Sequence, residues 1–305
     1  MATPVLVNSR SPIPVQADRM ARIEDRIAQL DKQISTGEKF TEPAQDPAGA
    51  NRAAALVRMT GRLDAEQRVI DRASSRLALA ETGIESASEA LLRARDLALS
   101  AANGSMDAES RQIIAHEIAI LKSQLIDAAN SRDDSGRFLF GGADNAQPPY
   151  AADPDGGVVR WQGFGGTAGA EAAGVVTAAP PGGPQLFGDE ATGAFALLDQ
   201  LTAALMEPEN EARNLALASA IEGLDHANDR LILGQALIGA GGARLQVESN
   251  RIASAKLDVA RGIADVRGVD LTAAFVEMQS LQMTLNASQL SFSRLFDGTL
   301  FDRLG

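Results

Sequence analysis

The residues best suited to binding a nucleotide are the glycines of the run Gly163-Phe164-Gly165-Gly166-Thr167-Ala168. This run fits the relaxed dinucleotide-binding pattern and follows a candidate strand at 158–161. Such a site also needs a helix N-terminus aimed at the pyrophosphate, inside a repeated strand–helix–strand unit. Residues 169–174 are poor helix formers, and no strand–helix alternation follows. We therefore predict a glycine-rich loop without a cofactor.

Acidic and histidine side chains lack the spacing of a metal site. The segment 153–156, Asp-Pro-Asp-Gly, resembles the start of a calcium loop, but the position that needs a bidentate Glu is Gln162. His116 and His226 are the only histidines, and neither has a second ligand at metal-binding spacing. No serine or aspartate lies in a recognisable nucleophile turn, and the chain has no cysteine. The sequence predicts no metal, no cofactor and no enzymatic activity.

Charge and hydropathy exclude further classes. The 305 residues carry a formal net charge of −12 with only four lysines, so a nucleic-acid or acidic-membrane surface is not expected. No run of eighteen apolar residues is present, which argues against a membrane span. The first twenty residues do not resemble a signal peptide, so any export is expected to proceed without a cleaved signal.

The elements that remain are long helices, indicated by apolar residues that recur every seven positions. A sustained heptad of this kind makes a stripe that only another helix can cover. The first stripe predicts a helix of about 75 Å, and the second predicts an antiparallel partner that returns along it. We name these two stripes the heptad core: Leu56, Leu63, Ile70, Leu77, Ile84 and Leu91, with Leu224, Leu231, Ile238, Leu245, Ile252 and Val259.

Each end of the chain carries a shorter apolar stripe with spacings of three and four. We expect the two stripes to be complementary, and both ends to be mobile in a free monomer and ordered on assembly, because an isolated helix of this length is marginal in water. We name them together the terminal seam: Met20, Ile23, Ile27, Leu30 and Ile34, with Leu271, Met278, Leu281, Leu285, Phe292 and Leu295.

Prolines and glycines delimit the N-terminal helix. Pro4, Pro12 and Pro14 predict that no continuous helix forms before Asp18. Gly37 is placed to end that helix in a left-handed cap.

The segment 38–49 then reads as an extended connector. It contains Pro43 and ends at Gly49. Asp46 is the predicted N-cap of the first long helix, with Pro47 at its first position.

The middle of the chain predicts a shorter helix and an insertion. A helix capped by Ser105 or Asp107 should run to about Asn130, with Ile114, Ile118, Leu121, Leu125 and Ala128 buried. The apolar group 137–140 is either a short strand or an anchor. Gly and Pro crowd 143–189, where 158–161 and 175–177 are the plausible strands.

Helix should resume near Thr192, and after Pro208 the second long helix should run from about Asn210 to Val266. Its glycines predict a bend at 239–242, and the final helix should open at Asp270.

These elements predict a mainly α-helical fold, an elongated antiparallel helical bundle or coiled coil with paired N- and C-terminal helices and a small β-rich or irregular insertion at its tip. The expected segments are an N-terminal arm and helix (1–42), the first half of the bundle (43–142), the insertion (143–190), the second half of the bundle (191–268) and the C-terminal helix (269–305).

Three passages resemble the bacterial flagellin superfamily. Residues 34–49 are similar to its connector, 94–104 to the end of its first long helix, and Asp134-Ser135-Gly136-Arg137-Phe138-Leu139-Phe140-Gly141-Gly142 to a motif of its hook–filament junction branch. Residues 243–248 and 270–295 are similar to its C-terminal pattern. Glu38-Lys39 and Gln45 depart from the family, which has a basic pair and an aspartate there.

The resemblance implies a non-enzymatic structural subunit, exported unfolded and located in the extracellular flagellum at the hook–filament junction. Its implied partners are further copies of itself, hook-associated protein 1, flagellin, and an export chaperone at the C-terminal helix. Two alternatives stay open at this point: a flagellin that builds the filament itself, and an intracellular coiled-coil adaptor or an enzyme that uses the glycine-rich tip.

Overall fold

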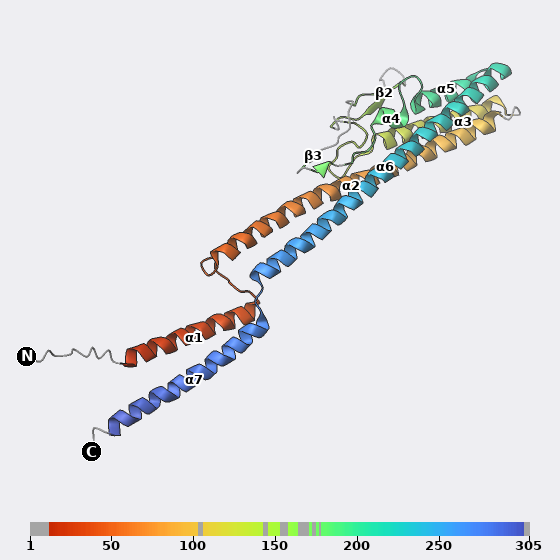
Figure 1. The fold of residues 1–305 in the computed structure, drawn as a ribbon. Helices are drawn as coiled ribbons and strands as arrows, with labels where there is room; N and C mark the ends of the chain where they lie inside the picture. Colours follow the sequence, from red (N-terminus) through yellow and green to blue (C-terminus); the bar gives the residue numbers. More distant parts are fainter. Residues whose placement is uncertain are drawn as a thin grey trace, which may run out of the picture. The chain divides into compact units, whose positions relative to one another are not determined.

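The computed structural model describes residues 12–102, 106–142, 146–152, 158–163, 171–172, 175–176 and 178–301. Seven helices lie in this part of the chain: α1 (Pro12–Thr36), α2 (Pro47–Ala102), α3 (Ala108–Ala129), α4 (Gly183–Phe187), α5 (Ala194–Met206), α6 (Asn210–Arg267) and α7 (Leu271–Phe301). The strands described are β1 (Tyr150–Ala152), β2 (Val159–Trp161), β3 (Glu171–Ala172) and β4 (Val175–Val176). The prediction of a mainly helical fold with a small insertion is confirmed (Figure 1).

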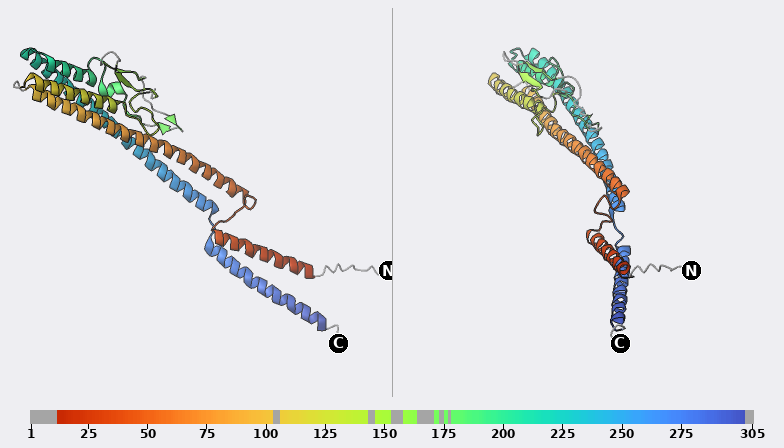
Figure 2. Two further views of the ribbon diagram at one scale, coloured as in Figure 1. Left: turned by 180° about the vertical axis from the view of Figure 1, so that it is seen from behind. Right: turned by 90° about the vertical axis from the view of Figure 1, so that its left-hand side faces the viewer.

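The chain divides into two compact units, one of residues 1–61 with 256–305 and the other of residues 62–255. In the second unit, α2, α3, α5 and α6 form an antiparallel four-helix bundle. Polar pairs mark three of its neighbouring contacts: Arg93 with Glu117 joins α2 to α3, Lys122 with Asp199 joins α3 to α5, and Ser88 Oγ donates to Asn228 Oδ1 between α2 and α6. These helices lie side by side in both views of Figure 2.

The heptad core lies on the facing sides of α2 and α6. Eleven of its twelve side chains are at most 5% exposed, and Leu56 is half-buried. The ion pair of Arg251 with Glu66 at 3.3 Å, and the bond from Gln67 to Ser249, continue the antiparallel pairing within the second unit. The predicted stripe of α3 is buried as well, and Asp107 is its N-cap, with the carboxylate accepting from Ser110 N at 2.8 Å.

Local signals placed several helix ends correctly. Gly37 follows α1 with a φ of 72°, and its N–H donates to Gln33 O. Asp46 accepts from Gly49 N at 2.9 Å directly before Pro47, the first residue of α2. Asp270 accepts from Ala273 N and so caps α7.

The predicted start of α1 was wrong. The helix begins at Pro12 rather than at Asp18, with Pro12 and Pro14 in its first turn. The first N–H groups of a helix have no intrahelical acceptor, so a proline there removes no hydrogen bond. Pro4 lies outside the described residues.

The insertion contains more regular structure than predicted. The strands β2 and β4 were expected, but β1 pairs with β2 and β3 pairs with β4, so two further strands and the short helix α4 were missed. These elements are two to five residues long, too short for a periodic signal. The helix α6 continues through 239–242, and the bend predicted there stays a prediction.

A cluster of aromatic side chains lies under the insertion. Tyr150 lies against Phe187 and Phe195, with ring centroids 5.5 and 4.9 Å apart, and Phe140 contacts Phe187 at 5.8 Å. Asn130, at the end of α3, holds β1 through both backbone groups of Tyr150, at 2.8 and 3.0 Å. Within the predicted group 137–140, Phe138, Leu139 and Phe140 are buried and form an anchor in the core, whereas Arg137 is exposed.

Candidate assembly interface of the terminal helices

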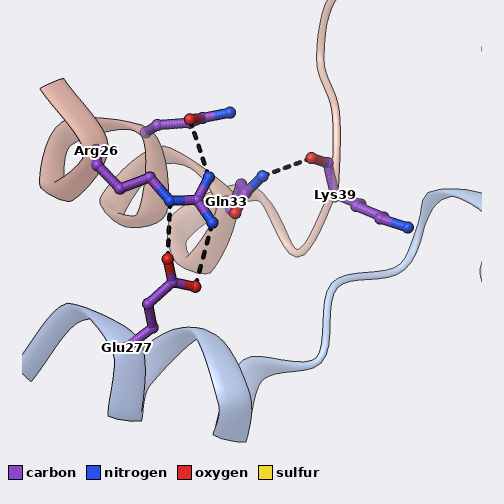
Figure 3. A network of polar contacts seen from close by, with 5 residues as sticks. Arg26, Gln33, Lys39 and Glu277 are labelled. Carbon is purple, nitrogen blue, oxygen red and sulfur yellow. Dashed lines mark hydrogen bonds and ion pairs between the residues drawn. The ribbon is translucent and has the colours of Figure 1, made fainter. Parts of the chain in front are cut away.

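The helices α1 and α7 pack against each other as an antiparallel pair, which confirms the predicted pairing of the N- and C-terminal helices. One two-pronged ion pair joins them: Arg26 Nε donates to Glu277 Oε1 at 2.9 Å, and Arg26 Nη2 donates to Glu277 Oε2 at 3.1 Å (Figure 3). Gln29 supports the guanidinium from the same helix. Both charged side chains are more than 40% exposed, so the pair contributes orientation more than stability.

The terminal seam is only partly buried by this pairing. Leu30 is 1% exposed and is the one member of the seam that is fully buried among those whose side chains are described. The half-buried members are Met20, Ile23, Ile27, Ile34, Met278, Leu281, Leu285 and Phe292. The side chain of Leu295 lies outside the described residues. Two helices alone therefore leave most of the seam in contact with solvent.

Leu271 does not pack in the seam, contrary to the prediction. It is 52% exposed, and Ala274, at 5%, takes the buried place at this end of α7. Helical side chains lean towards the N-terminus of their helix. Since Leu271 is the first residue of α7, its side chain projects beyond the packed part of the pair.

A second row of apolar residues on α7 was not predicted from the sequence. Val276, Met283 and Leu290 are spaced by seven and are 62%, 68% and 61% exposed, and Phe275 beside them is 48% exposed. The signal was present in the sequence as a second heptad, offset from the seam by two residues. Large exposed apolar side chains that recur on one face of a helix make that face a candidate interaction surface.

The connector is held against the start of α7. The hydrogen bond from Lys39 N to Arg267 O is 2.6 Å long, and the one from Val269 N to Gly37 O is 3.1 Å long. Between them, Glu38 and Gly268 form an antiparallel bridge. Arg267 Nη2 donates to Glu38 Oε2 at 3.2 Å, and Gln33 Nε2 donates to Lys39 O (Figure 3). The acidic residue at position 38, a departure from the family pattern, thus has a basic partner on the opposite segment.

Phe40 and Gly49 close the connector over α2. Phe40 is 5% exposed, and a Cβ on Gly49 would lie 2.4 Å from Asp46 Oδ2 and 2.9 Å from Phe40 Cε1. Gln45, the other departure from the family, accepts from Thr41 N at 3.0 Å. Pro43 lies exposed in the turn between them.

An open groove of about 350 Å³ lies between α1, the connector and α7, and Leu30, Phe40, Ala274 and Glu277 are among its lining residues. It is a gap left between the paired helices rather than an enclosed site. Arg26 bonds to Gln29 and Glu277 there, and Gln33 donates to the backbone oxygen of Lys39.

Few of the residues considered first for chemistry lie in the described part of the chain. His116 and His226 are exposed on α3 and α6. The run 164–168 and the segment 153–156 lie outside the described residues. Within the described part of the chain, no three acidic or histidine side chains are grouped to hold a metal ion, and no helix is long and apolar enough to cross a membrane.

Comparisons with known proteins agree with this geometry. Residues 7–145 match the model of the bacterial flagellin N-terminal helical region, and residues 221–297 match that of the C-terminal helical region, together more than two thirds of the chain. The flagellar hook-associated protein 3 of Escherichia coli is 24% identical over 287 residues, covering 88% of this chain and 90% of that protein.

Solved structures show the same fold. The structure of a putative flagellar hook-associated protein from Vibrio parahaemolyticus matches with a TM-score of 0.66 at 20% identity, covering 73% of this chain and all of that one. FlgL of Xanthomonas campestris matches with a TM-score of 0.59 at 16% identity, covering 68% of this chain and 98% of that one. With both flagellin helical regions present and its two terminal helices paired, the chain belongs to the bacterial flagellin family.

Proposed function

We propose that this chain is a structural, non-enzymatic subunit of the bacterial flagellum, located at the junction between hook and filament. The observation that carries the proposal is the incomplete burial of the terminal seam. The pair α1 and α7 buries Leu30, leaves eight seam residues half-buried and exposes a second apolar stripe on α7. A subunit that completes its core in contact with neighbouring subunits would have such a pair.

The contrast with the heptad core supports this reasoning. The α2–α6 interface buries the heptad core almost completely within one chain. Both stripes are made of the same kinds of residue, but the α2–α6 pair closes over its stripe and the α1–α7 pair does not. Further copies of this chain would supply the missing cover, and the expected flanking partners are hook-associated protein 1 on the hook side and flagellin on the filament side.

The place at the junction, rather than in the filament, is supported by the relatives, which are named flagellar hook-associated protein 3 and FlgL. The resemblance of residues 134–142 to the motif of the junction branch adds to this support. The backbone of this segment forms a tight loop in which Asp133 Oδ1 accepts from Ser135 N and Arg137 N, and Phe138 and Phe140 are buried behind it. We further propose export without a cleaved signal peptide and an export chaperone at α7.

Removal of the gene tests the location. In its absence, hooks should form without attached filaments, and flagellin should be found free in the medium. Expression of the unchanged chain should restore filaments, and labelled chain should appear as one band at the hook–filament boundary. Label distributed along the filament, or purified chain that forms long filaments unaided, would instead indicate a filament subunit.

The seam is tested by exchanging half-buried residues for serine. Ile27→Ser together with Leu281→Ser should leave the second unit folded and abolish incorporation into the flagellum. Arg22→Ser with Gln282→Ser, at exposed positions of the same two helices, is the matched control and should be incorporated normally. Normal incorporation of the seam variant would contradict the role of the seam.

A further inference from the structure

We infer that the two short segments 37–39 and 267–269 form a clasp that sets the register between α1 and α7. The clasp consists of the bridge between Glu38 and Gly268 and the two backbone hydrogen bonds that flank it, Lys39 N to Arg267 O and Val269 N to Gly37 O. It lies where α1 ends and just before α7 begins, so it fixes the point from which both helices run.

The terminal seam cannot fix this register by itself. Sliding α7 along α1 by seven residues would replace Ala274 by Leu281 and Met278 by Leu285, and the contact would stay apolar. Such a slip moves the helix by about 10 Å. Heptad stripes are tolerant of it, because register in helix pairs is normally specified by polar or differently shaped residues.

The polar contact between the two helices is too weak to select one register. The ion pair of Arg26 with Glu277 is exposed on both sides, and exposed pairs contribute little to stability. After a seven-residue slip, Arg26 would face Thr284 and remain solvated. The slipped pair would therefore cost little at this position.

The clasp leaves no such freedom. Only Val269 and Asp270 separate Gly268 from the first residue of α7, and Gly37 directly follows the last residue of α1. A seven-residue slip would need more chain than these links contain. The clasp is also braced on three sides, by the ion pair of Arg267 with Glu38, by the bond from Gln33 to Lys39 O, and by Gly268 N donating to Ala264 O.

Gly268 shows how closely the clasp is built. Its φ is not in the left-handed region, so backbone conformation does not require glycine there. A Cβ at this position would lie 2.4 Å from the backbone oxygen of Ala264. Any other residue at 268 would push the segment away from α6 or break the last turn of that helix.

Cysteine pairs test the register, because the chain has no cysteine of its own. Arg26→Cys with Glu277→Cys reports the register of the structure, and Arg26→Cys with Thr284→Cys reports the slipped register. Each pair is placed in full-length chain carrying Val269→Pro, which removes one donor of the clasp, or Val269→Ala, which keeps the donor as the matched control. Disulfide yield on mild oxidation is then measured in chain assembled into flagella, because α1 and α7 are expected to order only on assembly.

With Val269→Ala, the 26/277 pair should form in clear excess over the 26/284 pair. Val269→Pro should reduce that excess roughly tenfold, the effect expected for the loss of one or two backbone hydrogen bonds. An unchanged ratio in the two variants would overturn the proposal, as would equal yields of both pairs with Val269→Ala.

A second variant guards against unfolding by proline. Gly268→Ala should disturb the clasp through the contact with Ala264, and it should lower the 26/277 excess in the same direction. Gly242→Ala, at a helical glycine of α6 with open space around its Cβ position, is the matched control and should leave the excess unchanged. Equal ratios for Gly268→Ala and Gly242→Ala would also overturn the proposal.

Discussion

Replacing Leu30 and Ile84 by alanine, one at a time, separates the two kinds of interface in this chain. The side chains are 1% and 0% exposed, and alanine removes a comparable apolar volume from each. Leu30 lies between α1, the connector and α7, whereas Ile84 lies in the heptad core between α2 and α6. Contacts in the structure alone would predict similar losses of stability.

The magnitudes follow from the cost of a cavity. Truncation of a buried Leu or Ile to Ala costs about 2–5 kcal/mol. For Ile84→Ala this loss falls on the second unit, where it corresponds to a decrease in Tm of roughly 4–20 °C. For Leu30→Ala we expect no change in the Tm of the free chain, because α1 and α7 are predicted to order only on assembly.

Thermal unfolding of the purified chain, followed by circular dichroism at 222 nm, measures the first effect. Incorporation into flagella by complementation measures the second, and Leu30→Ala should fail there while Ile84→Ala chain that remains folded should be incorporated. Hydrogen exchange on the free chain adds a direct readout, with low protection expected across 20–34. Equal decreases in Tm for the two variants, or strong protection of 20–34 in the monomer, would refute the reasoning.

Three further predictions concern the second unit. Tyr150→Phe should raise the free energy of unfolding by about 1 kcal/mol, measured by urea titration, because none of the described residues bonds to its buried hydroxyl and burial raises the pKa of this phenol. A less stable variant would show that the hydroxyl is bonded. Gly234→Ala should lower the Tm, since its Cβ would lie 2.2 Å from Leu186 Cδ2 on α4, whereas Gly239→Ala, with open space around it, should not. Hydrogen bonds from Ser110, mainly from its backbone N–H and then from its side chain, lower the pKa of Asp107 below its ordinary value of 3.8. The cap should therefore stabilise α3 fully above pH 3.8 and lose its effect as the pH falls through the lowered pKa. Asp107→Asn should flatten this part of the pH profile of Tm, and an unchanged profile would contradict the assignment.

The local signals in the sequence determined the helices and many of their ends. A heptad stripe needs no knowledge of its partner, because its spacing alone requires a covered helix face. The caps at Asp46, Asp107 and Asp270 depend on bonds to backbone groups three residues away. Such short-range features can be read from neighbouring residues, and the structure confirms them.

Other features were settled only when distant segments met. The bridge between Glu38 and Gly268 joins residues about 230 positions apart, and nothing near either residue predicts it. The absence of a side chain at Gly234 leaves space for Leu186 of α4. Asn130 forms hydrogen bonds with the backbone of Tyr150 in β1. The short strands of the insertion likewise exist through their pairing, since two or three residues have no periodicity to read.

The sequence by itself thus determined which faces of the helices had to be covered, because apolar spacing along a helix is a local property. The tertiary structure decided how far each face is covered within one chain. The heptad core is complete and the terminal seam is not, although both have the same residue types. Burial depends on how closely a partner helix packs along a stripe, and that packing is set by contacts between segments far apart in the chain.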